Sequence, residues 1–80
     1  MSQFKESDLP LEFHHGELLT LSDGTTVRFE SNGEAKDIML NDGFAPAATL
    51  FPGNEFCFEA HGDRFCMTCT FEDSVTIAKS

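Results

Sequence analysis

Apolar and polar residues alternate between residues 25 and 31 of the chain. Within residues 25–31, Val27 and Phe29 are apolar and the residues beside them are polar. A period of two places one face of a strand against a core and the other in water. An Asp-Gly dipeptide separates this run from a β-prone run at residues 17–21, and an Asn-Gly dipeptide follows it. Both dipeptides supply the positive φ angles of tight hairpin turns, so the pattern predicts strands at 17–21 and 25–31.

Four further β-segments follow these two. They are the run AKDIML at residues 35–40, two strands that flank the sequence HGDR at 61–64, and the run SVTIAK at 74–79. Segments with these turn spacings are typical of a small barrel or sandwich. We predict a single small all-β domain over residues 14–80, mainly antiparallel, with about five to six short strands in a meander. An SH3-like or OB-like barrel is expected, because closure removes exposed sheet edges.

The first thirteen residues lack this regularity. Residues 1–13 are mostly polar and contain Pro10. We predict a tail there, or at most one short helical turn that begins near Ser2 or Ser7.

Residues 44–54, FAPAATLFPGN, are the longest irregular segment, because two prolines interrupt any regular strand ladder. Phe44, Leu50 and Phe51 are nevertheless strongly apolar. The favoured interpretation is that this loop covers one end of the barrel and closes the core, since so small a fold needs many buried residues. The alternative is an exposed apolar patch for a partner or for a second copy of the chain.

Composition narrows the class of protein. A chain of 80 residues buries only about 60% of its unfolded surface, so no roomy interior pocket is expected. Nine Phe without Trp or Tyr predict a Phe-based core. The formal charge of −9 disfavours binding to nucleic acid or to an anionic membrane. It favours a protein partner whose basic surface normally holds nucleic acid.

The N-terminus shows no secretory pattern and no segment is long enough to span a bilayer, so we expect a cytoplasmic protein. Thiols are normally reduced in that compartment. The odd number of cysteines, three, also argues against a disulfide framework.

The cysteines lie in one stretch with a histidine. Cys57, His61, Cys66 and Cys69 supply four ligands of the kind a structural zinc site takes. The same stretch alternates apolar and polar residues on both sides of a turn, which predicts a hairpin. With His61-Gly62 as the two-residue turn, Cys57 lies opposite Cys66. The same register pairs Phe58 with Phe65 and Glu59 with Arg64. With Gly62-Asp63 as the turn the register would shift, but the same residues would face the core.

The hairpin disfavours the zinc site. It separates Cys57 from His61 by about 13 Å and places Cys69 on the opposite face from Cys66. We therefore predict a buried Cys69 and two outward thiols, with a zinc-binding or thiol-based domain as the alternative function. A cross-strand disulfide between Cys57 and Cys66 is allowed by geometry but is expected to stay open in a reducing cell. The expected core face comprises Phe56, Phe58, Ala60, Phe65, Met67, Cys69 and Phe71.

Catalytic motifs are missing from the sequence. It has no glycine-rich phosphate loop, no nucleophile turn and no His-x-x-x-His helix. The adjacent His14 and His15 would point in opposite directions on an extended segment, so a solvated pair is expected. We expect neither enzymatic activity nor a cofactor.

The leading functional hypothesis is an acidic inhibitor that occupies a basic site on a larger nucleic-acid-handling complex. Mobile elements encode such proteins against host defence, anti-CRISPR and anti-restriction proteins among them, and the association rests on composition and size alone. A self-associating accessory subunit that uses the loop from Phe44 to Phe51 is a further alternative. The candidate partner-binding residues are Glu55, Glu59, Glu72, Asp73, Phe44, Leu50 and Phe51.

Overall fold

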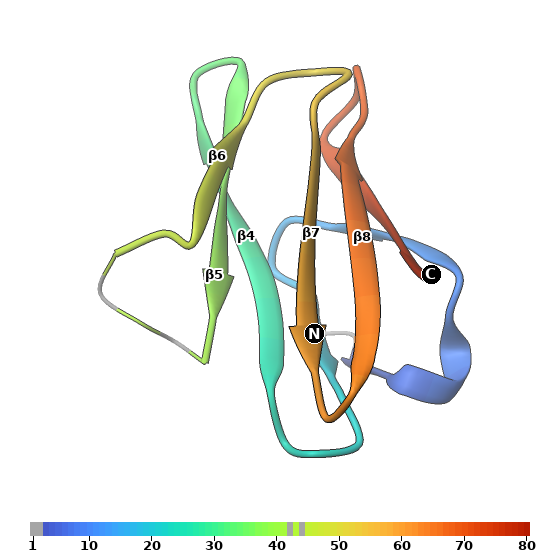
Figure 1. Ribbon diagram of the computed structural model, residues 1–80. Coiled ribbons are helices and arrows are strands. Elements are labelled where there is room, and N and C mark those ends of the chain that lie inside the picture. The colour runs from blue at the N-terminus through green and yellow to red at the C-terminus, as the bar shows by residue number, and fades with distance from the viewer. Residues whose placement is uncertain (1–2, 42, 44) are drawn as a thin grey trace.

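The computed structural model describes residues 3–41, 43 and 45–80, and most of them lie in β-strands (Figure 1). Within these residues, no helix is long and apolar enough to cross a membrane. The described elements are β1 (Gln3–Lys5), the 3-10 turn η1 (Glu6–Asp8), β2 (Leu11–His14), β3 (Leu18–Thr20), β4 (Thr26–Asn32), β5 (Ala35–Leu40), β6 (Ala48–Leu50), β7 (Glu55–Ala60), β8 (Asp63–Cys69) and β9 (Ser74–Lys79).

These strands form two sheets. One has the order β1-β3-β4-β5-β6 and the other the order β2-β9-β8-β7. All neighbours are antiparallel except β1, which runs parallel to β3. Among the described strands, the chain crosses from one sheet to the other three times, between β1 and β2, between β2 and β3, and between β6 and β7. The first and the last of these crossings join edge strands, so the two sheets together follow a barrel-like circuit. The predicted all-β, mainly antiparallel fold class is confirmed.

The prediction of a polar tail is wrong for most of the N-terminal segment. Only η1 matches the expected helical turn, whereas β1 and β2 are edge strands of the two sheets. Phe13 of β2 is fully buried. The alternation of Leu11 and Phe13 with polar neighbours is a strand pattern, but it covers only four residues beside Pro10.

The segment 44–54 is also more regular than expected. Its residues 48–50 form β6, which pairs with β5, and Leu50 is buried in the core. This agrees with a segment that closes the core. Leu50 is therefore wrong as a member of an exposed patch, and Phe44 lies outside the described residues.

The core lies between the two sheets and combines aromatic and aliphatic side chains. Phe13 and Phe29 meet edge to face with ring centroids 5.5 Å apart, and Phe65 stacks on Phe58 at 5.5 Å. Phe71 is 88% exposed, so its assignment to the core face is wrong. The buried cluster consists of Phe13, Leu19, Leu21, Val27, Phe29, Ile38, Leu50, Phe65, Met67, Cys69, Val75 and Ile77.

The β7–β8 hairpin has the register that follows from His61-Gly62 as the turn, the first of the two alternatives. Cys57 pairs with Cys66, Phe58 with Phe65 and Glu59 with Arg64. The turn residues His61 and Gly62 have φ angles of 42° and 84°, as a two-residue turn with both central residues left-handed requires. Cys57 and Cys66 form a disulfide, which corrects the expectation of two open thiols, whereas Cys69 is free and buried as predicted.

Candidate functional site

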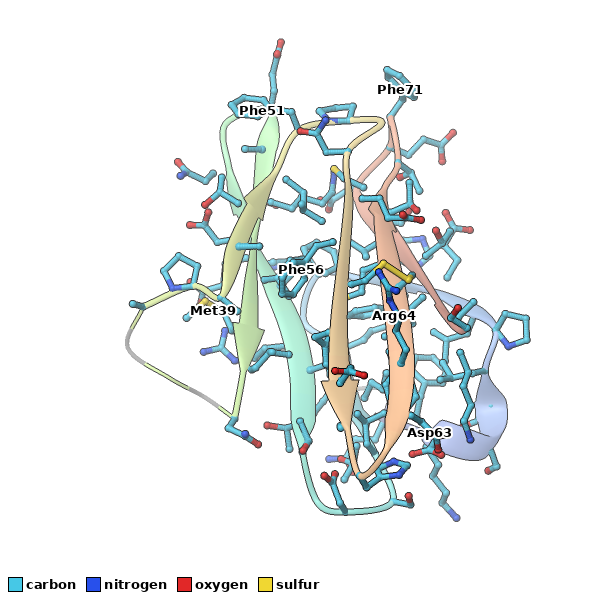
Figure 2. All side chains as sticks on the ribbon, viewed as in Figure 1. Met39, Phe51, Phe56, Asp63, Arg64 and Phe71 are labelled. Atoms are coloured by element: carbon cyan, nitrogen blue, oxygen red, sulfur yellow. A yellow bond between two sulfur atoms is a disulfide. The ribbon has the colours of Figure 1, made fainter. Side chains whose placement is uncertain are left out.

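A groove with two exposed aromatic side chains lies at one end of the molecule (Figure 2). Phe51 is 55% exposed and Phe71 is 88% exposed, and both line a hollow of about 580 Å³. The groove is built from the β4–β5 turn, the link between β6 and β7, and the β8–β9 turn. Its exposed carboxylates are those of Glu34, Glu72 and Asp73.

The β8–β9 turn is held by the hydroxyl group of Thr70. The backbone N–H of Glu72 donates to Thr70 Oγ1 at 3.1 Å, and this hydroxyl lies 2.9 Å from the carbonyl oxygen of Ser74, to which it donates. Ser31 donates its hydroxyl proton to Asp73 Oδ1 at 3.2 Å and so ties the turn to β4. These bonds hold residues 71–73 outward, at the end of the sheet.

The link that carries Phe51 is fixed to the same turn. Phe51 N–H donates to Asn54 Oδ1 at 3.2 Å, and Asn54 N–H donates to the Phe51 carbonyl at 2.9 Å. Gly53 N–H donates to the Cys69 carbonyl, and Cys69 N–H donates to the Asn54 carbonyl. Because Cys69 directly precedes Thr70, the two aromatic side chains stand on backbones that are bonded together. Such an arrangement lowers the entropy cost of binding a partner.

Lys36 lies among the groove residues but points inward. Its side chain is only 5% exposed, and its Nζ donates to Cys69 Sγ at 3.3 Å. The exposed charge of the groove is therefore that of its carboxylates.

This combination of groups suits a cationic guest. The face of an aromatic ring attracts an ammonium or guanidinium group by about 0.5–2 kcal/mol. A carboxylate beside the ring adds a charge-assisted hydrogen bond, which is bidentate when the cation is an Arg guanidinium group. The groove can thus hold an Arg or Lys side chain that projects from another protein.

The structure divides the acidic residues that the sequence singled out. Glu72 and Asp73 line the groove together with Phe51. Glu55 and Glu59 are exposed on β7, opposite Thr68 and Arg64 respectively, and outside the groove.

The sequence did not predict Glu34 and Phe71 as groove residues. Glu34 follows the Asn-Gly turn dipeptide and resembles an ordinary solvated turn residue. Phe71 continues the alternation of β8, but the strand ends at Cys69 and the turn reverses its direction. The cluster of Thr, Glu, Asp and Ser at residues 70–74 was the available signal for a turn.

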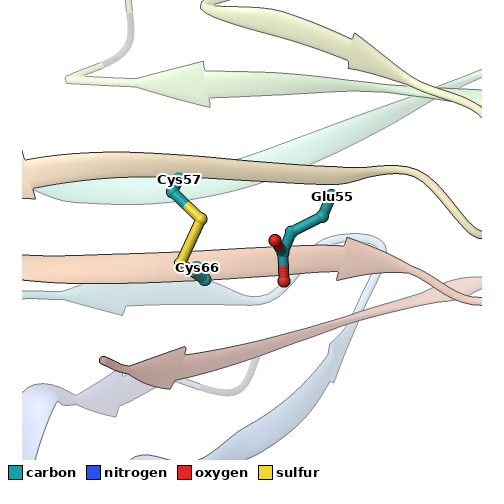
Figure 3. A group of neighbouring side chains, drawn as sticks. All are labelled: Glu55, Cys57 and Cys66. Carbon is teal, nitrogen blue, oxygen red and sulfur yellow. A yellow bond between two sulfur atoms is a disulfide. The ribbon is translucent and has the colours of Figure 1, made fainter.

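The four residues of the zinc hypothesis do not meet. Cys57 and Cys66 are joined to each other on the outer face of β7 and β8, with Glu55 beside them (Figure 3). Cys69 faces the core beside Lys36, and His61 lies in the turn at the opposite end of β8. This set of ligands is therefore wrong.

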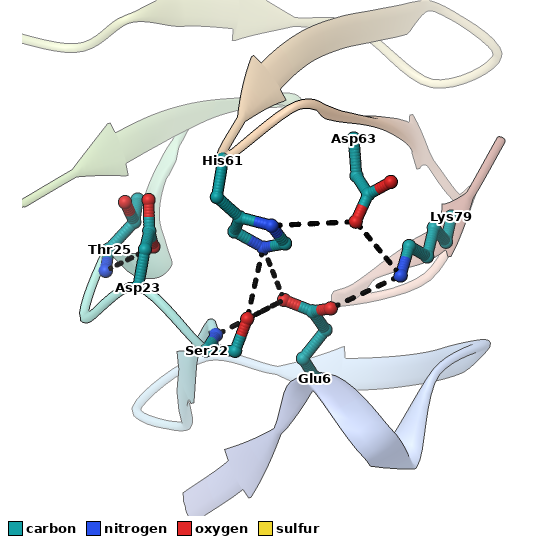
Figure 4. A network of polar contacts seen from close by, with 7 residues as sticks. All are labelled: Glu6, Ser22, Asp23, Thr25, His61, Asp63 and Lys79. Carbon is teal, nitrogen blue, oxygen red and sulfur yellow. Dashed lines mark hydrogen bonds and ion pairs between the residues drawn. The ribbon is translucent and has the colours of Figure 1, made fainter.

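A second polar cluster surrounds His61 (Figure 4). Its Nε2 lies 2.7 Å from Glu6 Oε1, and its Nδ1 lies 3.4 Å from Asp63 Oδ2. The amine of Lys79 is within 3.3 Å of Glu6 and 3.0 Å of Asp63. Ser22 donates both its backbone N–H and its hydroxyl proton to Glu6 Oε1, at 3.1 and 3.0 Å.

These contacts shift three pKa values. The backbone N–H of Ser22 is the largest cause that lowers the pKa of Glu6 from 4.5 to about 2, and the His61, Ser22 and Lys79 side chains add to it. The hydrogen bond to Glu6 raises the pKa of His61 above 6.5. Asp63 first, and then Glu6, raise the pKa of Lys79 above 10.5. All three shifts favour the charged forms.

The cluster superficially has the order of a nucleophile, a base and a carboxylate. Ser22 Oγ lies 3.2 Å from His61 Nε2, whose ring contacts Asp63 on its other side. However, Glu6 Oε1 accepts the Ser22 hydroxyl proton and lies 2.7 Å from His61 Nε2. This nitrogen therefore directs its own proton at the carboxylate and has no lone pair with which to take the serine proton. The geometry favours a clamp that joins η1, the β3–β4 turn, the β7–β8 hairpin and β9.

Compared with models of protein families, with curated proteins and with solved structures, the chain matches none of them. Its function must therefore be argued from its own residues.

Proposed function

We propose that the protein is a non-enzymatic binding module that recognises a basic surface of a protein partner. The observation that carries the proposal is the groove between Phe51 and Phe71, in which two exposed aromatic side chains stand beside three exposed carboxylates. Arg or Lys side chains of the partner fill the groove, with their alkyl stems on the rings and their charges on Glu34, Glu72 and Asp73.

The charge of the whole chain supports the same kind of partner. With 14 acidic and 5 basic residues, the molecule attracts basic surfaces over a distance of about one Debye length and accelerates their encounter. The groove then supplies the short-range contacts. Steering and contact act at different distances, so they respond differently to salt and to single substitutions.

The narrower form of the proposal is inhibition. A surface rich in Arg and Lys commonly serves to hold nucleic acid, and an acidic module bound there excludes the nucleic acid by competition. This form of the proposal places the chain with the small acidic inhibitors that mobile elements direct against host defence complexes, an association from composition and size. Support for this form comes from charge and size, and the groove adds a place where the partner's cations are held.

Self-association is the competing use of the same surface. Two exposed Phe side chains in one groove are an apolar patch of the kind that pairs with a second copy. The carboxylates oppose it, since a symmetric contact would bring Glu34, Glu72 and Asp73 of both copies together. We therefore rank self-association below binding to a basic protein partner.

The experiment is affinity capture followed by measurement with the purified partner. Tagged protein is exposed to nuclease-treated host lysate, and the captured protein is then titrated with the wild type, Phe71→Ser, Glu72→Lys and Glu59→Lys at two salt concentrations. Glu59→Lys is the matched control, because it makes the same charge change on β7, outside the groove.

We expect Phe71→Ser and Glu72→Lys to weaken binding by roughly tenfold or more, or at least about 1.4 kcal/mol, and Glu59→Lys by much less. The partner should release nucleic acid when the wild type binds. Equal losses in both charge variants would reject the groove and leave only net charge. A salt-insensitive partner would reject recognition of a basic surface. No partner, together with a dimeric mass in light scattering, would reject the proposal in favour of self-association.

A further inference from the structure

Three potential ligand groups lie together on the outer face of the β7–β8 hairpin, away from the groove (Figure 3). Glu55 and Cys57 are two positions apart on β7 and so face the same side, and Cys66 lies directly opposite Cys57 on β8. One carboxylate oxygen of Glu55 and the two sulfur atoms lie within 4.8 Å of one another. Both cysteines are partly exposed to solvent, so reagents reach them.

We infer that the reduced form of this site binds a thiophilic divalent cation of the Zn²⁺ class. The Cys57 and Cys66 thiolates and the Glu55 carboxylate are its protein ligands, and water takes the fourth position. The site goes beyond the proposed binding function and involves none of the groove residues. In the oxidised protein the disulfide consumes two of the three ligands, so metal binding depends on the redox state.

The hairpin keeps the two sulfur atoms within reach of one ion after reduction. The register of β7 and β8 is set by the His61-Gly62 turn and by the ladder of paired residues, not by the disulfide alone. Opposed side chains on adjacent strands stay neighbours, with Cβ atoms about 4.5–5.5 Å apart. Two thiolates on a tetrahedral zinc ion lie about 3.8 Å apart, which small rotations of the side chains provide.

The reaction that opens the site balances with a phosphine and water. The phosphine attacks one sulfur atom and breaks the S–S bond. The oxygen of water ends on phosphorus as a phosphine oxide, and its two hydrogens protonate Cys57 and Cys66. Zinc then replaces these two protons as it binds, so uptake releases acid. Phosphorus is oxidised by two electrons and the disulfide is reduced by two.

The cluster around His61 is a weaker metal site, although Glu6, His61 and Asp63 also lie within 4.8 Å of one another. The two carboxylates contact opposite nitrogens of one imidazole ring, so an ion on either nitrogen would have to draw one carboxylate away from its present contact. Lys79 already places a positive charge between the carboxylates. A metal would have to displace this amine.

The test uses Co²⁺ as a spectroscopic probe and Zn²⁺ as a competitor. Full-length protein is reduced with tris(2-carboxyethyl)phosphine, freed of excess reagent without air, and titrated beside the oxidised protein. The variants are Cys57→Ser, Glu55→Gln and the matched control Glu59→Gln, which lies on the same face of β7 at the other side of Cys57. Circular dichroism follows the fold throughout.

We expect a thiolate-to-cobalt charge-transfer band in the reduced wild type only, and its loss when one zinc ion per chain is added. Cys57→Ser should abolish the band, Glu55→Gln should weaken affinity by roughly tenfold or more, and Glu59→Gln should leave it unchanged. A folded, reduced protein without the band overturns the inference. So does a band that survives Cys57→Ser, or a hairpin that unfolds on reduction, because the site depends on its register.

Discussion

His61 Nε2 lies 2.7 Å from Glu6 Oε1, although 55 positions separate the two residues in the chain. The contact joins the 3-10 turn near the N-terminus to the turn of the β7–β8 hairpin, so it forms only when both sheets are in place. Each residue shifts the pKa of the other toward its charged form. Stability should therefore depend on pH in two separate ranges.

The pH dependence follows from the direction of each shift. The pKa of His61 is raised, so its contribution is complete below about pH 6.5 and is lost as the pH rises through the higher folded value. The pKa of Glu6 falls from 4.5 to about 2, so its contribution is present above pH 4.5 and is lost as the pH falls toward 2. The stabilisation that this pair contributes should therefore be largest between about pH 4.5 and pH 6.5. Melting curves recorded over a series of pH values would show it as the highest thermal midpoint.

Two variants separate the two ranges. His61→Asn keeps a residue that tolerates the left-handed turn. It should remove the loss of stability above about pH 6.5 and leave most of the loss below pH 4.5, because Ser22 is the largest cause of the lowered pKa of Glu6. Glu6→Gln should weaken the pH dependence of stability in both ranges and return the pKa of His61 toward 6.5 in an NMR titration. An unchanged His61 titration in Glu6→Gln would refute the pairing.

Truncation of two phenylalanines should change the unfolding free energy by very different amounts. Phe65 is fully buried between Phe58 and His61, so Phe65→Ala should cost about 3–5 kcal/mol of unfolding free energy. Phe71 is 88% exposed, so Phe71→Ala should stay within about 0.5 kcal/mol of the wild type. Urea unfolding measures both. A destabilisation by Phe71→Ala comparable to that of Phe65→Ala would show that the ring is packed and not available to a partner.

The hairpin turn makes a prediction about the backbone alone. Gly62 has a φ of 84°, and a Cβ placed there would meet no atom within 4 Å. Gly62→Ala should therefore cost about 1–2 kcal/mol through backbone strain without a steric clash. Gly62→Asn should cost less, because Asn enters the left-handed region more readily. Equal stability of the Ala variant and the wild type, measured by urea unfolding of the oxidised protein, would contradict the turn geometry.

The sequence predicted this hairpin, with the observed register as one of two alternatives, because its information is local. The alternation of apolar residues and the His-Gly turn set the register, which placed Cys57 opposite Cys66 correctly. Whether the two thiols are joined was inferred from the expected compartment, a property that residues 56–72 do not encode, and that inference was wrong.

What the sequence did not predict depends on contacts between distant segments. β1 has three residues and pairs in parallel with β3 across the intervening β2, a pattern without any local turn signal. The clamp of Glu6 and His61 likewise exists only after the sheets have packed. The groove was found in part, since Phe51, Glu72 and Asp73 were candidates, but alternation alone could not show that β8 ends before Phe71.

The buried pair beneath the groove allows the last prediction. Lys36 is 5% exposed and Cys69 is 1% exposed, and the sulfur is the hydrogen-bond partner of the Lys36 amine among the described residues. A buried amine held by one weak acceptor contributes little, so Lys36→Met, which keeps the volume, should leave the unfolding free energy unchanged or raise it by about 1–4 kcal/mol. Cys69→Ala should instead cost about 1–3 kcal/mol, because it removes that acceptor.

A double-mutant cycle tests whether the two residues act together. In the Lys36→Met background, Cys69→Ala should cost less than in the wild type by at least about 0.5 kcal/mol, because no buried amine then loses its partner. Any cost that remains in this background is the cavity left by the sulfur atom. Additive losses, measured by urea unfolding with equal m-values, would mean that the bond between Lys36 Nζ and Cys69 Sγ contributes no coupling energy.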